Sequence, residues 1–188
     1  MKNNFVIGLL VVIAVLAVAN YEAHAPLAPH NLGTTSHQAL PEVALASVLG
    51  TRTKLSNCRG SGPLADSGCT PGAVFPAVTK AIVCVKGYSQ SVRNVPASEK
   101  LAVYAAYSIA SHASGQYEVD HLISLELGGS NDIANLWPEP ADPVPGFHQK
   151  DRVENYLHEQ VCQGSISLPS AQHNIANNWL SVYQTMPR

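Results

Sequence analysis

The C-terminal part of the chain carries two stretches in which hydrophobic residues recur at helical spacing. The first covers 147–162 and is followed by Gly164, a helix stop signal. The second, over about 168–184, opens with Ser167 and Pro169, which are typical of a helix start. Its apolar positions are spaced for burial on one face: Ala171, Ile175, Trp179 and Val182. The pattern therefore predicts two consecutive amphipathic helices.

The middle of the chain combines a third expected helix with strand-like sequence. A helix is predicted at about 98–109, with one buried face formed by Leu101, Tyr104, Ala105 and Ile109. Residues 117–127 alternate loosely and are rich in β-forming side chains, which predicts a strand. A Gly-Gly-Ser-Asn-Asp turn cluster follows at 128–132. The order across 117–162 is thus strand, long loop, strand remnant and helix.

The N-terminus has the pattern of a secretory signal peptide. Lys2 precedes an apolar run over 5–19, and small-x-small cleavage signatures follow at 17–19 and 23–25. A membrane anchor is the alternative, but a spanning helix needs about 20 apolar residues. Cleavage within 1–25 is therefore the favoured interpretation, and it places the mature protein in the periplasm or outside the cell.

The segment between the expected signal peptide and the helices has few regular patterns. Residues 26–79 are divided into a Pro-, Ala- and His-rich linker and a loop region with many Gly, Pro and Ser. The short apolar run 81–85 fits either a strand or the end of a helix. We expect three parts: a signal peptide at 1–25, a linker and loop region at 26–79, and one domain at 80–188.

Composition excludes some classes of function. The chain has 188 residues, only 13% of them charged, and a formal net charge of −2. A protein that coats nucleic acid would be strongly basic, so this class is excluded. Any binding to nucleic acid is expected to be weak, salt-sensitive and without sequence specificity, because neither a positive surface nor a base-reading motif is evident.

The four cysteines fit an oxidising compartment. Four cysteines allow three pairings. The segment between Cys58 and Cys69 is rich in Gly, Ser and Pro and needs a local cross-link, whereas Cys84 and Cys162 both lie in apolar stretches. We therefore favour Cys58–Cys69 and Cys84–Cys162. A zinc site built from all four is disfavoured because no Cys-x-x-Cys pair is present.

Candidate chemistry gathers in the strand–loop–helix segment. Asp120 and His121 are adjacent on the predicted strand, where their side chains point to opposite faces. Asn135 follows the Gly-Gly turn, and His148 lies in the first turn of the predicted helix. This set resembles the HNH motif of the ββα-metal (His-Me finger) endonucleases. The residues that carry the resemblance are Val119-Asp120-His121, Leu127-Gly128-Gly129, Asn135-Leu136, His148 and Lys150.

The resemblance extends over about half of the chain and implies a role for each residue. In exported HNH nuclease-like proteins of bacteria, a similar block precedes a helix like the one expected here at 147–162. By this resemblance His121 is the general base, Asp120 and His148 bind one divalent cation, and Asn135 orients His121 through a hydrogen bond. Mg²⁺ is the expected ion, with Mn²⁺ and Ni²⁺ as alternatives, since oxygen and imidazole ligands suit all three.

Further side chains near the motif are candidates for supporting roles. Glu118 shares the strand face of Asp120 and is a candidate extra ligand or a group behind the ligands. Lys150 and Arg152 lie at the start of the helix and are candidate phosphate contacts. The chain departs from the family pattern at Ser124, where a Pro is usual. It also has His-x-Lys instead of His-x-x-Lys, which puts the role of Lys150 in doubt.

These observations lead to one expected fold and two functional hypotheses. The fold class is α+β, with a ββα-metal (HNH) finger around 117–162 braced by the flanking helices. The first hypothesis is an exported, metal-dependent endonuclease that hydrolyses phosphodiester bonds of DNA, with RNA as a second substrate class and little sequence specificity. The alternative is a non-catalytic exported envelope or binding protein that retains an HNH-like scaffold.

Overall fold

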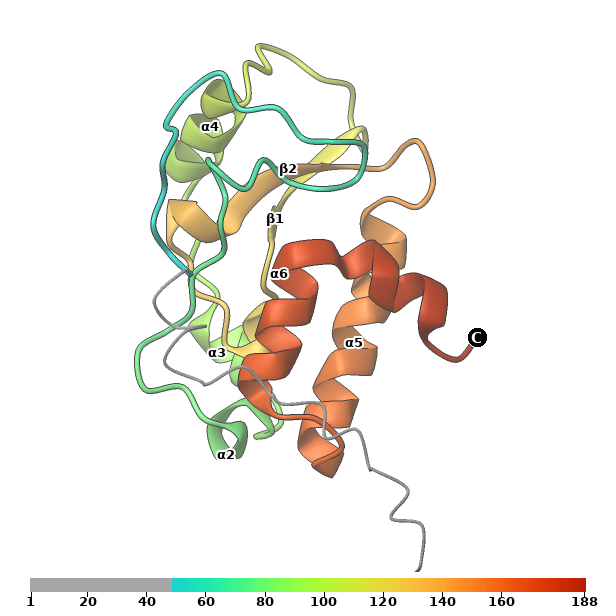
Figure 1. The fold of residues 1–188 in the computed structure, drawn as a ribbon. Coiled ribbons are helices and arrows are strands. Elements are labelled where there is room, and N and C mark those ends of the chain that lie inside the picture. The colour runs from blue at the N-terminus through green and yellow to red at the C-terminus, as the bar shows by residue number, and fades with distance from the viewer. Residues whose placement is uncertain (1–48) are drawn as a thin grey trace, which may run out of the picture. The chain divides into compact units, whose positions relative to one another are not determined.

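The computed structural model describes residues 49–188, and the predicted signal peptide and most of the predicted linker lie outside the described residues. The described part is α+β, with helices around a two-stranded antiparallel sheet (Figure 1). The longer elements are α4 (Ala97–Ala106), β1 (Tyr117–His121), β2 (Leu136–Pro140), α5 (Phe147–Gln163) and α6 (Leu168–Thr185). Short helical elements are α2 (Lys80–Val83), α3 (Tyr88–Val92), η1 (Leu125–Leu127) and η2 (Ile133–Asn135).

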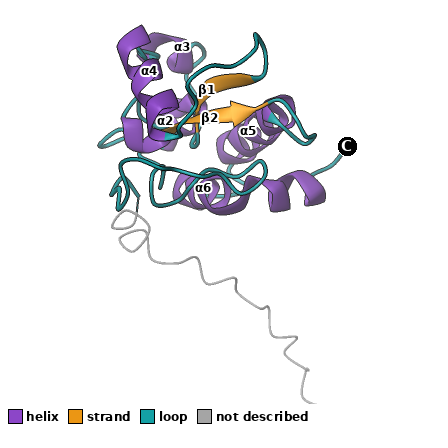
Figure 2. Cartoon of the chain, turned by 90° about the horizontal axis from the view of Figure 1, so that it is seen from above, coloured by secondary structure: helices purple, strands orange, loops and turns teal. Residues whose placement is uncertain are grey.

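The main core lies between α5 and α6, which run side by side in both ribbon views (Figures 1 and 2). Each helix contributes one apolar stripe, as the hydrophobic spacing predicted. The buried members are Val153, Leu157 and Val161 of α5 with Leu168, Ala171, Ile175 and Trp179 of α6. Ile123 and Leu127, from the segment after β1, complete this core. The core therefore attaches the segment after β1 to both long helices.

Two of the predicted elements differ from the structure. β1 ends at His121, not at Leu127, because the chain turns into the 3₁₀ helix η1 a few residues later. The helix predicted at 98–109 is α4, and its buried residues are Val103 and Ala106. Leu101, placed on the buried face by the sequence pattern, is 69% exposed. The sequence pattern predicts too long a strand because a buried 3₁₀ turn carries the same apolar residues as a strand.

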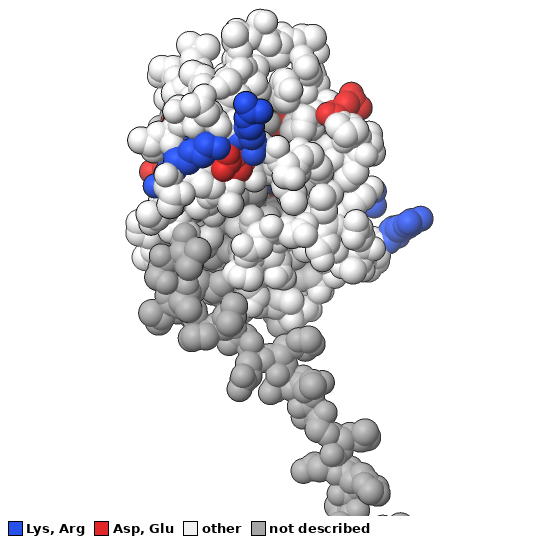
Figure 3. All heavy atoms as spheres, turned by 45° about the horizontal axis from the view of Figure 1, so that its top comes forward, with Lys and Arg blue, Asp and Glu red and all other residues white. Residues whose placement is uncertain are grey.

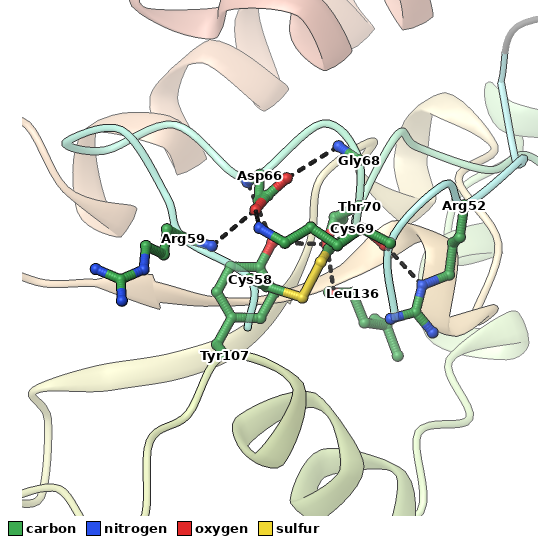
Figure 4. Close-up of a disulfide and its surroundings, with 10 residues drawn as sticks. Arg52, Cys58, Arg59, Asp66, Gly68, Cys69, Thr70, Tyr107 and Leu136 are labelled. Atoms are coloured by element: carbon green, nitrogen blue, oxygen red, sulfur yellow. Dashed lines mark hydrogen bonds and ion pairs between the residues drawn. A yellow bond between two sulfur atoms is a disulfide. The ribbon is translucent and has the colours of Figure 1, made fainter. Parts of the chain in front are cut away.

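The region predicted as loop has no helix or strand over 51–79, but it is held by a network (Figure 4). The disulfide Cys58–Cys69 closes it, as predicted. Asp66 accepts hydrogen bonds from the Lys54 ammonium (2.8 Å) and from the backbone N–H groups of Arg59 (2.8 Å) and Gly68 (3.0 Å). One carboxylate thus satisfies donors that a loop would otherwise leave unpaired.

The second disulfide is Cys84–Cys162, again as predicted. Cys84 caps the C-terminal end of α2, so the apolar run 81–85 is the end of a helix and not a strand. The bond ties this short helix to the end of α5. Both disulfides are typical of proteins from an oxidising environment. Over residues 49–188, no helix is long and apolar enough to span a membrane.

Candidate active site

Carboxylates from both strands face α5. Glu118 and Asp120 are two residues apart on β1, so their side chains share one face of the sheet. Glu139 of β2 pairs with Glu118 in the antiparallel register and therefore points to the same side. The helix presents Lys150 to this face and places its ammonium 2.7 Å from Asp120 Oδ2 and 3.7 Å from Glu139 Oε2.

Lys150 is the centre of this cluster. Its side chain is 0% exposed. The ammonium also donates hydrogen bonds to the backbone carbonyl of His121, at 2.8 Å, and to the carboxylate of Glu154 one turn further along α5. A buried cation is tolerated only when acidic partners surround it, and here three carboxylates and a carbonyl do so. Lys150 thereby fixes both the side chain of Asp120 and the backbone of His121.

The protonation of the cluster follows from its burial. Burial alone would lower the pKa of Lys150, but the charges of Asp120, Glu154 and Glu139 raise it well above its ordinary value. Burial alone would raise the pKa of Asp120, but the Lys150 ammonium outweighs burial and holds the pKa of this carboxyl below its usual range. Burial raises the pKa of Glu139 well above normal and that of Glu154 to about 8. The Lys150 ammonium therefore favours the charged form of Asp120, whereas Glu139 and Glu154 keep their protons to a higher pH than free carboxyl groups do.

His121 points to the other face of β1 and is held by Asn131. Its Nε2 lies 3.1 Å from Asn131 Oδ1. The Asn131 amide nitrogen donates to the carbonyl of Val92 (2.8 Å), and Oδ1 accepts from the backbone N–H of Asn94 (3.2 Å). Since this leaves Oδ1 as an acceptor, His121 Nε2 must carry the proton, and Nδ1 keeps a free lone pair.

The free ring nitrogen of His121 is buried. The residue is 1% exposed, and Nδ1 has no hydrogen-bond partner in the structure. Burial lowers the pKa of the imidazole below its ordinary value of about 6.5. The hydrogen bond that His121 donates to Asn131 and the charge of Asp120 oppose this shift, while Arg93 and Lys150 add to it. The ring is therefore neutral at pH 7 and has one nitrogen able to accept a proton.

Asn135 binds the backbone of the loop between the strands and does not bind His121. Its amide oxygen accepts from Ile123 N, and its amide nitrogen donates to the carbonyls of Ile123 and Ser130, each at 2.9 Å. No hydrogen bond joins Asn135 to His121, and the predicted contact is replaced by the one that His121 donates to Asn131. The reason is the direction of the Asn135 side chain, which is 0% exposed and turned toward the loop backbone.

The Gly-Gly turn makes this loop possible. Gly128 has a φ of +78°, in the left-handed region that favours glycine. A Cβ on Gly129 would lie 1.7 Å from the carbonyl oxygen of Ile123 and 2.8 Å from the Asn135 amide nitrogen. Only glycine allows the backbone to approach this closely. The motif residues therefore act together to shape the loop that follows His121.

An open cavity of about 550 Å³ lies beside Asp120. Its acidic wall comes from β1 and α5: Glu118, Asp120, Asp151 and Glu154. Its basic side chains, Arg93 and Lys100, come from the segment before α4 and from α4 itself. Both basic residues are exposed, and the sequence pattern predicts no role for either of them. Their sequence neighbourhoods carry no motif, and only the fold brings them to Asp120.

His148 lies on the exposed side of the first turn of α5, with its ring 4.4 Å from that of Phe147. Its surroundings are acidic. Burial raises the pKa of Glu118. The charges of Asp120 and Asp151 raise this pKa further, whereas Lys150 and His148 lower it. Burial also raises the pKa of Asp151, again with Asp120 adding and His148 opposing. His148 thus shares the electrostatic environment of Asp120, although no direct contact joins the two.

The two predicted phosphate contacts are placed differently from the cavity's basic residues. Lys150 is enclosed by carboxylates and has no solvent-exposed surface to offer a phosphate. Arg152 is exposed, but its guanidinium stacks over the ring of Tyr183 at 5.6 Å, next to the C-terminus of the chain. Arg93 and Lys100 are the basic side chains that line the cavity beside Asp120.

The cavity's acidic wall fits a divalent cation. Carboxylate oxygens are the ligands that Mg²⁺ prefers. Burial, and after it the neighbouring acids, raise the pKa values of Glu118, Asp151 and Glu154, so these carboxyl groups lie close to other negative charge. A bound cation would neutralise that charge. Of the two predicted metal ligands, Asp120 lines this cavity and His148 does not, and no three metal-ligating side chains converge here within the described residues.

A separate group of metal-ligating types lies toward the other end of α5. Cys84, His158 and Cys162 each offer a ligand atom, and these atoms lie within 4.8 Å of one another. This group could hold a metal ion. In the structure the two sulfur atoms are bonded to each other as a disulfide.

The surface does not present a broad positive field on the face drawn in Figure 3, where the few Lys and Arg side chains are scattered and partly accompanied by acidic groups. This agrees with the net charge of −2. Comparison of the chain with protein-family models, with curated proteins and with solved structures finds no match. The functional assignment therefore depends on the residues and geometry described above.

Proposed function

We propose that this protein is an exported, metal-dependent endonuclease of the HNH type, acting on DNA or RNA with little sequence preference. The observation that carries the proposal is His121. A neutral imidazole, with one nitrogen held by Asn131 and the other bare, lies next to a carboxylate beside an acidic cavity. A neutral imidazole with a free nitrogen is the chemical group that a general base for water activation requires.

The chain's own residues divide the work of hydrolysis. His121 Nδ1 takes the proton of the attacking water, while Asn131 keeps the ring in the tautomer in which Nδ1 is unprotonated. Asp120 and His148 would hold a divalent cation, and the chemistry such an ion would supply is neutralisation of negative charge on the scissile phosphate. Lys150 keeps Asp120 and the His121 carbonyl in place.

Substrate binding is assigned to the basic side of the cavity. Arg93 and Lys100 line the same cavity as the acidic side chains, so a phosphate bound there would meet basic groups as well as a bound cation. These contacts reach the backbone of a nucleic acid and not its bases. Binding is therefore weak and non-specific, in agreement with the low charge of the chain.

Export is part of the proposal. The predicted signal peptide directs the chain to the periplasm or the medium, and both disulfides suit such a compartment. By the resemblance to HNH nucleases, the two disulfides stabilise the fold in place of the structural zinc that pairs of cysteines hold in many of those enzymes.

Cleavage of a supercoiled plasmid tests the function. Purified protein with both disulfides intact is incubated with Mg²⁺, Mn²⁺, Ni²⁺ or EDTA, and nicked and linear products are followed by electrophoresis. Cleavage is expected only with a divalent ion. Its rate is expected to fall with pH only below about 6.5, because the pKa of His121 is lowered from that value by burial. A cleavage rate that already decreases on lowering the pH toward 6.5 would contradict the assignment of His121 as the base.

Three variants separate the roles. His121→Ala is expected to lower the rate by roughly 10²–10⁴. His148→Ala is expected to abolish metal-dependent cleavage without loss of stability, since this side chain is exposed. His112→Ala is the matched control because His112 is exposed and does not line the cavity beside Asp120. Plasmid cleavage at the wild-type rate by both His121→Ala and His148→Ala would refute the proposed function.

The enclosure of His121 favours a second candidate, a non-catalytic exported binding protein on the same scaffold. In the structure water does not reach Nδ1, and Asp120 is bonded to Lys150. This candidate predicts no cleavage of DNA or RNA with any divalent ion. The plasmid assay, repeated on single-stranded RNA, decides between the two.

A further inference from the structure

The group formed by Cys84, His158 and Cys162 has the layout of a metal site. His158 and Cys162 are one turn apart on α5 and therefore share a face of the helix. Cys84 approaches them from the end of α2. His158 Nε2 lies 3.4 Å from Cys162 Sγ, and all three potential ligand atoms lie within 4.8 Å of one another. Two sulfurs and an imidazole are ligands that zinc prefers.

The oxidised chain cannot use this group, because the thiolate and not the disulfide is the metal ligand. We propose that reduction of the Cys84–Cys162 disulfide converts this cross-link into a zinc site, with Cys84 Sγ, Cys162 Sγ and His158 Nε2 as ligands. The site is independent of the proposed nuclease centre, which lies near the start of α5.

Glu126 supplies a second, independent observation. Its Oε2 lies 3.8 Å from His158 Nδ1, on the side of the ring away from the sulfurs. A histidine that binds zinc through one nitrogen usually donates the proton of the other to a carboxylate or carbonyl. In the oxidised chain Nε2 instead donates to the Val83 carbonyl, at 3.0 Å. Binding moves the ring proton to Nδ1, where Glu126 is placed to accept it.

Accessibility separates the two disulfides. Cys84 and Cys162 are partly exposed, so a reductant and an ion can reach them. Cys58 and Cys69 are buried, at 2% and 0% exposed, and form no comparable group of ligands within the described residues. The partly exposed pair is therefore the one expected to respond to a reducing environment.

The step balances with a dithiol as the co-reactant. The external dithiol supplies two electrons and two protons, the S–S bond breaks to give two thiols, and the reductant becomes a disulfide. Zn²⁺ then binds both sulfurs as thiolates and releases the two thiol protons. Three protein ligands leave the fourth tetrahedral position to a water molecule. The metal takes over the role of the disulfide and keeps α2 attached to α5.

Cobalt titration tests the proposal. Purified protein is reduced with a phosphine, which does not compete for the metal as a thiol would, and is titrated with Co²⁺ without oxygen. One equivalent of Co²⁺ is expected to give thiolate-to-cobalt charge-transfer absorption and the intense visible bands of a tetrahedral site, both lost on addition of Zn²⁺. The unreduced protein is expected to give neither. Absence of these bands in the reduced protein would overturn the proposal.

Variants assign the ligands. Cys84→Ser/Cys162→Ser is expected to abolish the charge-transfer band, whereas the matched control Cys58→Ser/Cys69→Ser retains it. His158→Ala keeps both disulfides, so it folds in the oxidised state, and after reduction it is expected to lose the tetrahedral bands. Glu126→Gln is expected to weaken Zn²⁺ affinity by about 10–100-fold. A band that survives in Cys84→Ser/Cys162→Ser, or wild-type affinity in His158→Ala, would contradict the assignment.

Discussion

Replacing Lys150 with Met tests how the candidate site is held together. Met keeps most of the length and volume of the side chain and removes its charge. Asp120 then loses its ammonium partner, and the His121 carbonyl loses a donor. Removing one partner of a buried ion pair costs about 3–5 kcal/mol. Asp120 and Glu154 are 17% and 13% exposed, so some solvation remains and we expect the lower end, about 3 kcal/mol.

Urea unfolding with both disulfides intact measures this loss. For an m-value of about 2 kcal/mol/M, a loss of about 3 kcal/mol lowers the midpoint by about 1.5 M. The matched control is Lys86→Met, because Lys86 is exposed and takes part in no ion pair within the described residues. A surface change of this kind is expected to stay within about 0.5 kcal/mol.

The pH dependence of the loss identifies its cause. Without Lys150 the pKa of Asp120 is no longer held down, so the folded variant takes up protons that the folded wild type does not. The destabilisation is therefore larger at pH 8 than at pH 5. A loss below about 1 kcal/mol at pH 8, or one that is equal at both pH values, would refute an electrostatic role for Lys150.

Two further predictions concern the acidic cluster and the loop. Burial raises the pKa of Glu154 to about 8, so the folded chain holds a proton that the unfolded chain has lost above about pH 4.5. The unfolding free energy is thus expected to fall as pH rises between these values. In urea titrations Glu154→Gln is expected to flatten this fall, and an unchanged slope would count against the role given to Glu154. Gly129→Ala is expected to cost at least about 2 kcal/mol by displacing the loop's buried hydrogen bonds. Gly115→Ala meets no atom within 4 Å but lies at a φ of +75°, so it measures the cost of a left-handed backbone without a clash. A loss in Gly129→Ala no larger than the loss in Gly115→Ala would exclude the steric cause.

Local patterns predicted the elements that bury a continuous stripe. α5 begins at the predicted residue, and α6 lies within a residue of its predicted bounds, because both expose one apolar face to each other. Trp179 of α6 is 0% exposed for the same reason, and Trp137 of β2 is also buried, at 1% exposed. The face of α4 could not be chosen this way. Several of its faces carry apolar side chains, and the Cys58–Cys69 loop decides which one is covered.

The site was predicted only where its residues are close in sequence. Lys150 could have been recognised as buried, since it lies between Phe147 and Val153 at the spacing of the apolar stripe of α5. Its acidic partners could not, because Glu139 reaches it only through the register of β1 and β2. Asn131 is likewise linked to His121 by the path of the loop, which no spacing in the sequence encodes.

The unpaired nitrogen of His121 bears on the choice between the two functions. A buried polar atom without a partner costs about 1–3 kcal/mol, so a histidine with a purely structural role is expected to have both ring nitrogens bonded. Nδ1 of His121 has no partner, whereas Nε2 is held. A general base needs this asymmetry, and a non-catalytic scaffold gains nothing from it. Water must still reach Nδ1, and Asn131 joins His121 to the Val92–Asn94 segment. Movement of that segment would therefore be coupled to movement of the base itself.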